Sequence, residues 1–446
     1  MKFTKIAFSL IAAGVMTSPL AYATNGYFSH GYGMKAKGMA GVGIALPQDS
    51  IAAATNPAGM VMVGNRMDVG LDIFRPVRSS STTGYSAGLG NPPFQFIPSP
   101  GGPGTSVEYS GNGDSSFLIP EFGYNKMINS DSSFGVSVYG NGGMNTSYGD
   151  LNSGTFGPAP GLGVFGTGKA GVDLMQLFIA PTYSIKINPD NALGVSLNIA
   201  HQAISVYGIQ NFAGVSNTPS AVSNTGYDST NGWGVKLGWI GKVTPDISLG
   251  ATYQSTTKMG KFSKYSGLFA EEGGFDIPET YGVGITAKAT PDLTVSADIQ
   301  QINYSKVASV GNSINNLLTC LVGGPPNPGC LGGSNGAGFG WRDMTVFKLG
   351  ANYAYNQDVT LRGGVSTTRQ PIPENETFFN VLAPGVVETH LTLGATWSLA
   401  SDSELTVAYM HALEKTVNGT NTAVGGNGVG LKMYQDSIGI AYGWKM

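Results

Sequence analysis

The stretch that decides the fold is VETHLTLGATWSLASDSELTVAYM, residues 387–410, because it holds two strand patterns joined by one turn. Apolar residues alternate with polar or small ones on both sides of Ser401, as in a pleated strand that has one apolar face. Serine and aspartate form local hydrogen bonds in tight turns, so residues 401–404 predict a reversal of the chain. The stretch therefore predicts a β-hairpin with one apolar face.

Five more segments share this turn chemistry: NSDSS at 129, NPDNA at 188, TPDI at 244, TPDL at 290 and NQDV at 356. Short turns that alternate with seven longer connections are typical of an outer-membrane barrel with tight periplasmic turns and long extracellular loops. A soluble β-sandwich or a propeller is the alternative fold, but such folds seldom alternate short and long connections so regularly. We expect fourteen strands, near 65–75, 117–127, 132–140, 171–187, 191–206, 231–243, 246–259, 275–289, 292–305, 342–356, 358–370, 385–399, 402–415 and 431–446.

The composition agrees with a barrel. Charged residues make up 11% of the 446 residues, against roughly 25% in an ordinary soluble domain. Beyond the N-terminus no apolar run is long enough for a membrane helix, so a membrane protein of this composition must span with closed strands. The apolar faces would then meet lipid, with aromatic girdles near the strand ends. Each candidate could equally be a core aromatic; the candidates are Tyr253, Tyr281, Tyr304, Tyr353, Tyr355, Trp397, Tyr442 and Trp444.

Residues 1–23 have the features of a secretory signal peptide. Lys2 and Lys5 precede a short apolar stretch, and Ala21-Tyr22-Ala23 forms a small-residue cleavage site. A membrane anchor is the alternative, although the apolar stretch is too short to span a bilayer. We therefore expect a signal peptide over 1–23, a separate segment over 24–62 and the barrel over 63–446.

The two cysteines, Cys320 and Cys330, flank the loop LVGGPPNPG. In an exported chain, two thiols this close across a loop predict a disulfide. A metal site would need further ligands nearby, and the sequence offers none.

Residues 24–62 do not alternate, and they are rich in small residues. Asp49 or Ser50 is a suitable N-cap for a short helical stretch that precedes Pro57. A fourteen-stranded barrel would hold an open aqueous channel unless something filled it. We therefore expect this segment to be a small helical plug in the lumen.

One family resemblance rests on this segment. GMKAKGMAGVGIALPQDSIAAATNPAGM, residues 33–60, resembles the N-terminal hatch of the FadL/TodX (OmpP1) family of outer-membrane transporters for hydrophobic compounds. FGVSVYGNGGMNTSY at 134–148 and the stretch 277–305 are similar to strand regions of that family. The resemblance implies a plugged fourteen-stranded antiparallel barrel that takes up long-chain fatty acids or other hydrophobic molecules. It also implies a kinked third strand that opens the wall beside the hatch motif Asn56, Pro57 and Ala58.

The expected third strand runs into Gly140, Gly142 and Gly143. Glycine inside a strand marks a bulge or a sharp bend, so a kink is permitted at this point. The alternative is that these glycines only begin an extracellular loop. For the hatch, we expect the residues around Gly26, Tyr27 and Phe28 to cap a pocket in the lumen.

Two groups of residues are candidates for substrate contact. The loops at 91–102 and 155–168 are apolar, as in a capture groove, although loop-on-loop packing explains them equally well. Lys236, Lys348 and Arg362 fall on polar strand faces, where they can attract a fatty-acid carboxylate or pair with acids such as Glu388 or Asp298.

No pattern favours catalysis. Gly282-x-Gly284-x-x-Ala287 lies within an alternating strand rather than before a helix, and the four histidines are scattered, so we expect no cofactor, metal or catalytic residue. A mildly acidic chain, with a formal net charge of −3, offers no basic face for nucleic acid.

We expect a monomeric, passive outer-membrane transporter for hydrophobic small molecules, in contact with lipid and lipopolysaccharide. Long-chain fatty acids are the expected substrates. The alternatives are an aromatic hydrocarbon channel, a structural or adhesion barrel, and a general diffusion porin.

Overall fold

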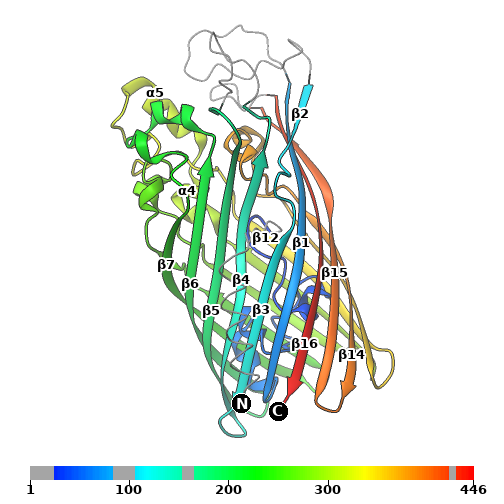
Figure 1. The fold of residues 1–446 in the computed structure, drawn as a ribbon. Helices are drawn as coiled ribbons and strands as arrows, with labels where there is room; N and C mark the ends of the chain where they lie inside the picture. The colour runs from blue at the N-terminus through cyan, green and yellow to red at the C-terminus, as the bar shows by residue number, and fades with distance from the viewer. Residues whose placement is uncertain (1–24, 84–105, 153–164, 421–427) are drawn as a thin grey trace, which may run out of the picture.

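The computed structural model describes residues 25–83, 106–152, 165–420 and 428–446, which form a tall closed barrel (Figure 1). The expected signal peptide over 1–23, the loop at 91–102 and most of the loop at 155–168 lie outside these described residues. Among the described helices, none has the length and apolar character needed to cross a bilayer.

Fourteen antiparallel strands make up the wall, as predicted. The last strand pairs with the first over their whole length, from Arg66 opposite Lys445 to Thr82 opposite Val429, and this pairing closes the sheet. The wall strands are β1 (Arg66–Thr83), β3 (Phe117–Met127), β4 (Ser132–Tyr148), β5 (Ala170–Asn188), β6 (Asn191–Tyr207), β7 (Asp228–Thr244), β8 (Ile247–Gln254), β10 (Thr280–Lys288), β11 (Leu293–Ile302), β12 (Met344–Ala354), β13 (Val359–Thr368), β14 (Thr389–Ala400), β15 (Ser403–Asn418) and β16 (Val429–Lys445).

The main difference from prediction is length at the end that carries the long loops. β1 continues to Thr83 and β4 to Tyr148, because both strands keep a hydrogen-bonded partner beyond the expected ends at 75 and 140. Two short strands, β2 (Ser106–Ser110) and β9 (Lys258–Met259), extend this rim.

The two faces of the wall differ as the alternation predicts. Leu391 and Leu393 on β14 are exposed on the outer surface, whereas Thr392 between them is buried toward the lumen. Most candidate girdle aromatics are exposed or half-buried, but Tyr304 is fully buried. Of the two alternatives, Tyr304 is a core aromatic, because β11 ends at Ile302 and Tyr304 turns inward among other aromatic rings.

Residues 25–62, called the hatch below, lie inside the barrel in its lower half, drawn in blue in Figure 1. Small residues allow this fit: a Cβ at wall residue Gly194 would lie 2.3 Å from the backbone nitrogen of Ala58. The helical parts of the hatch are α2 (Met34–Lys37), η1 (Ala52–Ala54) and η2 (Pro57–Met62).

The loops at the opposite end carry short helices, with α4 and α5 at the upper rim in Figure 1. The predicted disulfide is present, and it joins Cys320 of α5 to Cys330. The loop helices are η3 (Gln210–Val215), η4 (Pro219–Ala221), η5 (Ser263–Tyr265), α3 (Ala270–Gly273), η6 (Tyr304–Lys306), α4 (Ala308–Gly311), η7 (Ile314–Asn316), α5 (Leu317–Gly323), η8 (Glu374–Glu376) and η9 (Phe379–Val381).

Candidate functional site

The wall is interrupted between β3 and β4. These strands pair only from Met127 opposite Ser133 to Phe122 opposite Val138. Beyond that point residues 117–121 of β3 still pair with β1, and β4 still pairs with β5 up to Tyr148. The β3–β4 ladder therefore stops partway along the wall, while the ladders on both sides of it continue.

A bulge in β4 accompanies this interruption. Gly140 lies opposite Leu177 and Gly142 lies opposite Gln176, so Asn141 is the extra residue. The sequence permits a bend at Gly140, Gly142 and Gly143, and these glycines lie within β4, which continues to Tyr148. Pro120, which cannot donate to a ladder, lies in the stretch of β3 that pairs with β1 but not with β4, and it is a sequence signal that the prediction did not use.

The start of the hatch takes the place of β3 at the bulge. Gly143 donates its backbone N–H to the carbonyl of Tyr27 at 2.9 Å, and Ser29 donates to the carbonyl of Asn141 at 3.1 Å. Glycine is needed here, because a Cβ at Gly142 would lie 2.0 Å from the Tyr27 oxygen. Residues 27–29 therefore cover the interruption from the lumen side.

Contacts near the rim bound the interruption at its upper end. Ser147 exchanges backbone hydrogen bonds with Gly111 and Gly113, at 3.0 and 2.9 Å. The buried guanidinium of Arg78 donates to the side chain of Asn145 and to the carbonyl of Asp114. Together with the β3–β4 ladder below, these contacts leave a limited window in the wall, called the lateral window below.

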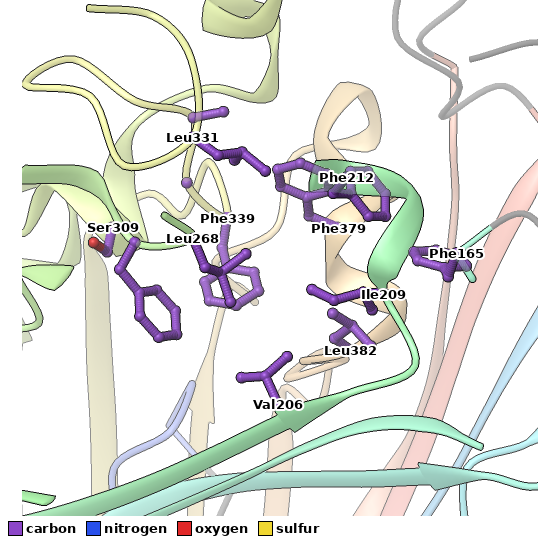
Figure 2. A pocket seen from close by; sticks show the side chains of 13 residues that line it. Phe165, Val206, Ile209, Phe212, Leu268, Ser309, Leu331, Phe339, Phe379 and Leu382 are labelled. Atoms are coloured by element: carbon purple, nitrogen blue, oxygen red, sulfur yellow. The ribbon is translucent and has the colours of Figure 1, made fainter. Parts of the chain in front are cut away.

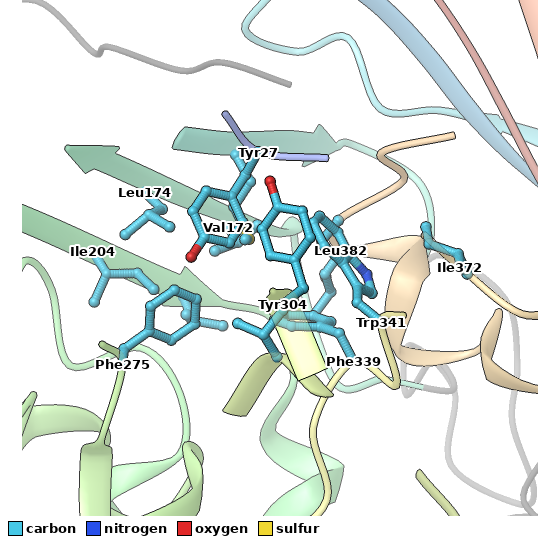
Figure 3. Close-up of a cluster of buried hydrophobic side chains, with 14 of the residues drawn as sticks. Tyr27, Val172, Leu174, Ile204, Phe275, Tyr304, Phe339, Trp341, Ile372 and Leu382 are labelled. Atoms are coloured by element: carbon cyan, nitrogen blue, oxygen red, sulfur yellow. The ribbon is translucent and has the colours of Figure 1, made fainter. Parts of the chain in front are cut away.

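Aromatic rings surround the hatch residues that face this window. The ring centroid of Tyr27 lies 5.0 Å from that of Tyr304 and 5.8 Å from that of Trp341. Figure 3 shows these side chains gathered with Phe275 and Phe339 from the loops above. The hydroxyl of Tyr304 donates to the carbonyl of Asn25 and accepts from the backbone N–H of Phe28, so the start of the hatch packs against this aromatic cluster.

Asn56 joins the hatch to the wall at a different place. Its side-chain nitrogen donates to the carbonyls of Ile44, Trp239 and Ala251, at 2.7, 3.0 and 3.3 Å. The carbonyl of Ala58 accepts from Ser184 of β5. The motif thus contacts the wall at β5–β8, whereas residues 27–29 pair with β4 at the bulge.

Buried charges hold the middle of the hatch. Lys35 pairs with Glu404 of β15, and Lys37 pairs with Asp72 of β1 at 2.5 Å. Sequence reasoning missed these pairs, because nothing in the chain indicates which distant strand faces a given lysine of the hatch.

Wall carboxylates also accept hydrogen bonds from the hatch backbone. Asp298 accepts from the N–H groups of Gly43 and Ile44, and Asp68 accepts from that of Ser50 at 2.8 Å. The middle of the hatch is therefore held through its main chain as well as through Lys35 and Lys37.

Asp49 is the one acidic residue within the hatch itself. Its carboxylate accepts a hydrogen bond from the backbone N–H of Ile51, as expected of a helix N-cap. The pKa of this carboxyl is raised to about 6, mainly by burial and also by the charge of Asp68, against the opposing effect of Lys35 and Arg66.

The three predicted carboxylate-binding cations all contact the hatch. Lys236 donates to the carbonyl of Ala54, Lys348 to that of His30 at 3.1 Å, and Arg362 to the side chain of Gln48. Lys236 and Lys348 line one small cavity, shared with Phe28, Asn141 and Asp298. Arg362 lies outside that cavity lining.

The alternative partners proposed for these cations do not form ion pairs with Lys236 or Lys348 among the described residues. Glu388 pairs with Lys415 at 2.6 Å instead, and Asp298 accepts from the hatch backbone. Both lysines donate to neutral carbonyl groups of the hatch, and Asp298 lines the same cavity.

An apolar pocket lies between the loops above the aromatic cluster (Figure 2). Phe165, the part of the loop at 155–168 that packs here, has its ring 5.6 Å from that of Phe212. The lining carries one polar side chain, that of Ser309. This loop pocket is lined by Phe165, Val206, Ile209, Phe212, Leu268, Phe269, Ser309, Leu331, Ala337, Gly338, Phe339, Phe379 and Leu382.

Comparison with known proteins gives one family and several solved structures. The model of a family described as outer membrane protein transport protein (OMPP1/FadL/TodX) matches residues 14–445. The Pseudomonas putida toluene transporter TodX is 18% identical, with a TM-score of 0.67 over 95% of this chain and 100% of that chain. The Ralstonia pickettii toluene transporter TbuX is 19% identical, with a TM-score of 0.62 over 94% and 99%.

A Pseudomonas aeruginosa FadL homologue is 15% identical, with a TM-score of 0.67 over 94% of this chain and 99% of that chain. At such identities the structures show likeness of fold alone. No curated protein sequence matches the chain.

Proposed function

Because this chain belongs to the OMPP1/FadL/TodX family of outer-membrane transport proteins, which are channels for hydrophobic compounds and not enzymes, we propose a specific route for such compounds through it. The compound enters the loop pocket, moves down to the aromatic cluster and leaves sideways through the lateral window between β3 and β4. The observation that carries this route is the interrupted β3–β4 ladder, which residues 27–29 of the hatch cover from the lumen side.

The energies of the contacts favour a sideways route over one straight down the barrel. Moving residues 27–29 away from β4 breaks hydrogen bonds between neutral groups, each of which contributes about 1 kcal/mol. Moving the middle of the hatch separates buried pairs such as Lys37 and Asp72, and leaving one such charge unpaired costs about 3–5 kcal/mol. The start of the hatch is therefore the part that opens, and transport follows the gradient of the substrate.

We propose a long-chain fatty acid as the substrate. The loop pocket suits an apolar chain, because its lining holds no charged side chain. The cavity that Asn141 of the bulge lines holds two lysines, Lys236 and Lys348, and one acid, Asp298, and this excess of basic groups favours an anionic head group.

An aromatic hydrocarbon is the second candidate substrate. The rings of Tyr27, Phe28, Tyr304 and Trp341 would stack well with another ring. TodX and TbuX, which share this fold, are toluene transporters.

Competition binding separates the two substrates. Purified protein is incubated with radiolabelled hexadecanoate and increasing toluene, and the experiment is repeated with Lys348→Met. If a fatty acid is the substrate, Lys348→Met weakens hexadecanoate binding and leaves toluene binding unchanged. Equal loss of both ligands would mean that the variant disturbs the hatch, and Lys236→Met then serves as the second variant.

Two further measurements address the remaining alternatives. A structural or adhesion barrel would give no uptake of either compound into cells that carry the protein. A general diffusion porin would conduct ions freely across a planar bilayer, whereas a barrel filled by the hatch passes little current.

A further inference from the structure

The disulfide between Cys320 and Cys330 lies at the edge of the loop pocket. Leu331, the residue after Cys330, lines the pocket, and both cysteines are buried. The loop that contains them connects β11 to β12 and has only short helices of its own, so contacts with other loops must hold its shape.

The segment that follows Cys330 joins two other loops through its backbone. Leu331 donates its N–H to the carbonyl of Val215 and accepts from the N–H of Asn217, both at 3.0 Å. Gly333 and Gly332 accept from the N–H groups of Glu271 and Glu272, at 2.8 and 3.0 Å. Residues 331–333 are therefore bonded to the β6–β7 loop on one side and to the β8–β10 loop on the other.

Both of those loops carry pocket residues close to these bonds. Phe212 lies in η3, which ends at Val215, and its ring faces Phe379 across the pocket at 5.3 Å. Leu268 and Phe269 immediately precede α3, which begins at Ala270. A shift of residues 331–333 would therefore displace three parts of the pocket lining together.

We propose that the Cys320–Cys330 disulfide is a positioning element for substrate capture: it holds residues 331–333 against α5 and thereby keeps the pocket walls that carry Phe212 and Leu268 in place. This proposal rests on the proposed function, in which the loop pocket captures the substrate. A cross-link between residues separated by 10 positions removes conformations from the open loop. Without the disulfide, the pocket is in its binding-competent arrangement for a smaller fraction of the time. The apparent affinity for the substrate falls in proportion to that fraction.

The test uses a diazirine analogue of hexadecanoic acid and the full-length protein in lipid vesicles. After illumination, mass spectrometry measures labelling of the peptide that contains Phe212 as a function of probe concentration. With Cys320→Ser and Cys330→Ser combined, the concentration for half-maximal labelling rises about tenfold, as expected for a tenfold smaller competent fraction. Val322→Ser, on the exposed side of α5, is the matched control and leaves labelling unchanged.

Two further measurements distinguish positioning of the pocket from a general loss of structure. Heat-modifiable electrophoretic mobility reports a closed barrel in every variant. Wild-type protein refolded with dithiothreitol labels weakly, and oxidised glutathione restores labelling: two cysteine thiols and one glutathione disulfide give the protein disulfide and two glutathione thiols.

The outcomes separate this proposal from the capture step on which it rests. If the wild type labels at Phe212 and Phe212→Ala weakens labelling, but the double serine variant labels like the wild type, the role of the disulfide is overturned and capture stands. If the oxidised wild type does not label the loop pocket at all, capture itself fails, and the role of the disulfide fails with it.

Discussion

The backbone N–H of Gly143 donates to the carbonyl of Tyr27 at 2.9 Å, although the two residues belong to the wall and to the hatch. In an uninterrupted barrel this position of β4 would face β3. The hatch therefore acts as a short substitute strand, which fills the lumen and also completes the wall.

The first prediction concerns the bulge. Deleting Asn141 would restore continuous pairing between β4 and β5, because this residue is the extra one in the register. A straightened β4 can extend its ladder with β3 and close the lateral window. Uptake of hexadecanoate into cells should then fall to the level of cells without the protein, while the barrel stays folded and becomes slightly more stable, by about 1 kcal/mol for each added hydrogen bond.

A second bulge provides the matched control for this deletion. The pairing of β15 with β16 also shifts register, between Ala412 and Lys415 near the rim. Deleting Glu414 removes an extra residue there, far from the window, and should leave uptake intact. Normal uptake in the Asn141 deletion would rule out the sideways route.

The second prediction concerns the buried pair of Lys37 and Asp72. Lys37→Met leaves the Asp72 carboxylate buried without its partner and should destabilise the hatch by about 3–5 kcal/mol. Hydrogen exchange of the backbone amides in α2 should speed up accordingly, and planar bilayers should show more ion current. Adding Asp72→Leu should restore slow exchange.

The exposed pair of Lys261 and Glu272 is the control for that experiment. Exposed ion pairs contribute about 0–1 kcal/mol, so Lys261→Met should change neither exchange nor current. If Lys37→Met behaved in the same way, the hatch would not depend on its buried charges.

The third prediction concerns Asn56. Asn56→Leu removes the donor shared by the carbonyls of Ile44, Trp239 and Ala251, and leaving such groups unsatisfied costs about 1–3 kcal/mol each. Thermal unfolding followed by circular dichroism should show a lower midpoint. Met62→Ser, on the exposed side of η2, should leave the midpoint unchanged, and an equal loss in both variants would contradict the role assigned to Asn56.

The fourth prediction is a pH dependence. The pKa of the Asp49 carboxyl is about 6 in the folded protein and near 3.8 in the unfolded chain, so the folded state binds more protons between these values. Ionised Asp49 therefore destabilises the fold above pH 6, and this cost disappears as the pH falls from 6 toward 4.

Asp49→Asn should remove that cost. The variant should unfold at a higher temperature than the wild type at pH 7.5, and the difference should vanish near pH 4. If the stability difference between the variant and the wild type did not change with pH, the ionisation of Asp49 would not be its cause.

The sequence predicts those features that depend on neighbouring residues. The hairpin around Ser401 follows from alternation and turn chemistry, and the disulfide follows from two cysteines across one short loop. The bulge follows from the glycines at 140–143, because glycine weakens a strand wherever it lies.

Features that depend on distant strands were missed. The contacts of Asn56 with β7 and β8 could not be predicted, nor could the pair of Lys35 with Glu404, which lies 369 positions away. Tyr304 turns into the lumen although its sequence neighbours suggest a girdle residue. A lumen position of this kind is set by the curvature and register of the whole barrel, which no short stretch of sequence encodes.

The closure of β1 on β16 also constrains biogenesis. Lys35 and Lys37 precede all fourteen strands, yet their partners lie on β15 and β1, which become part of one lumen only when the final strand has zipped onto the first. Insertion into the membrane and dehydration of the hatch must therefore finish together. An assembly intermediate without its last strand would contain a hydrated and loosely bound hatch. During assembly the protein would therefore be either open and hydrated or fully closed.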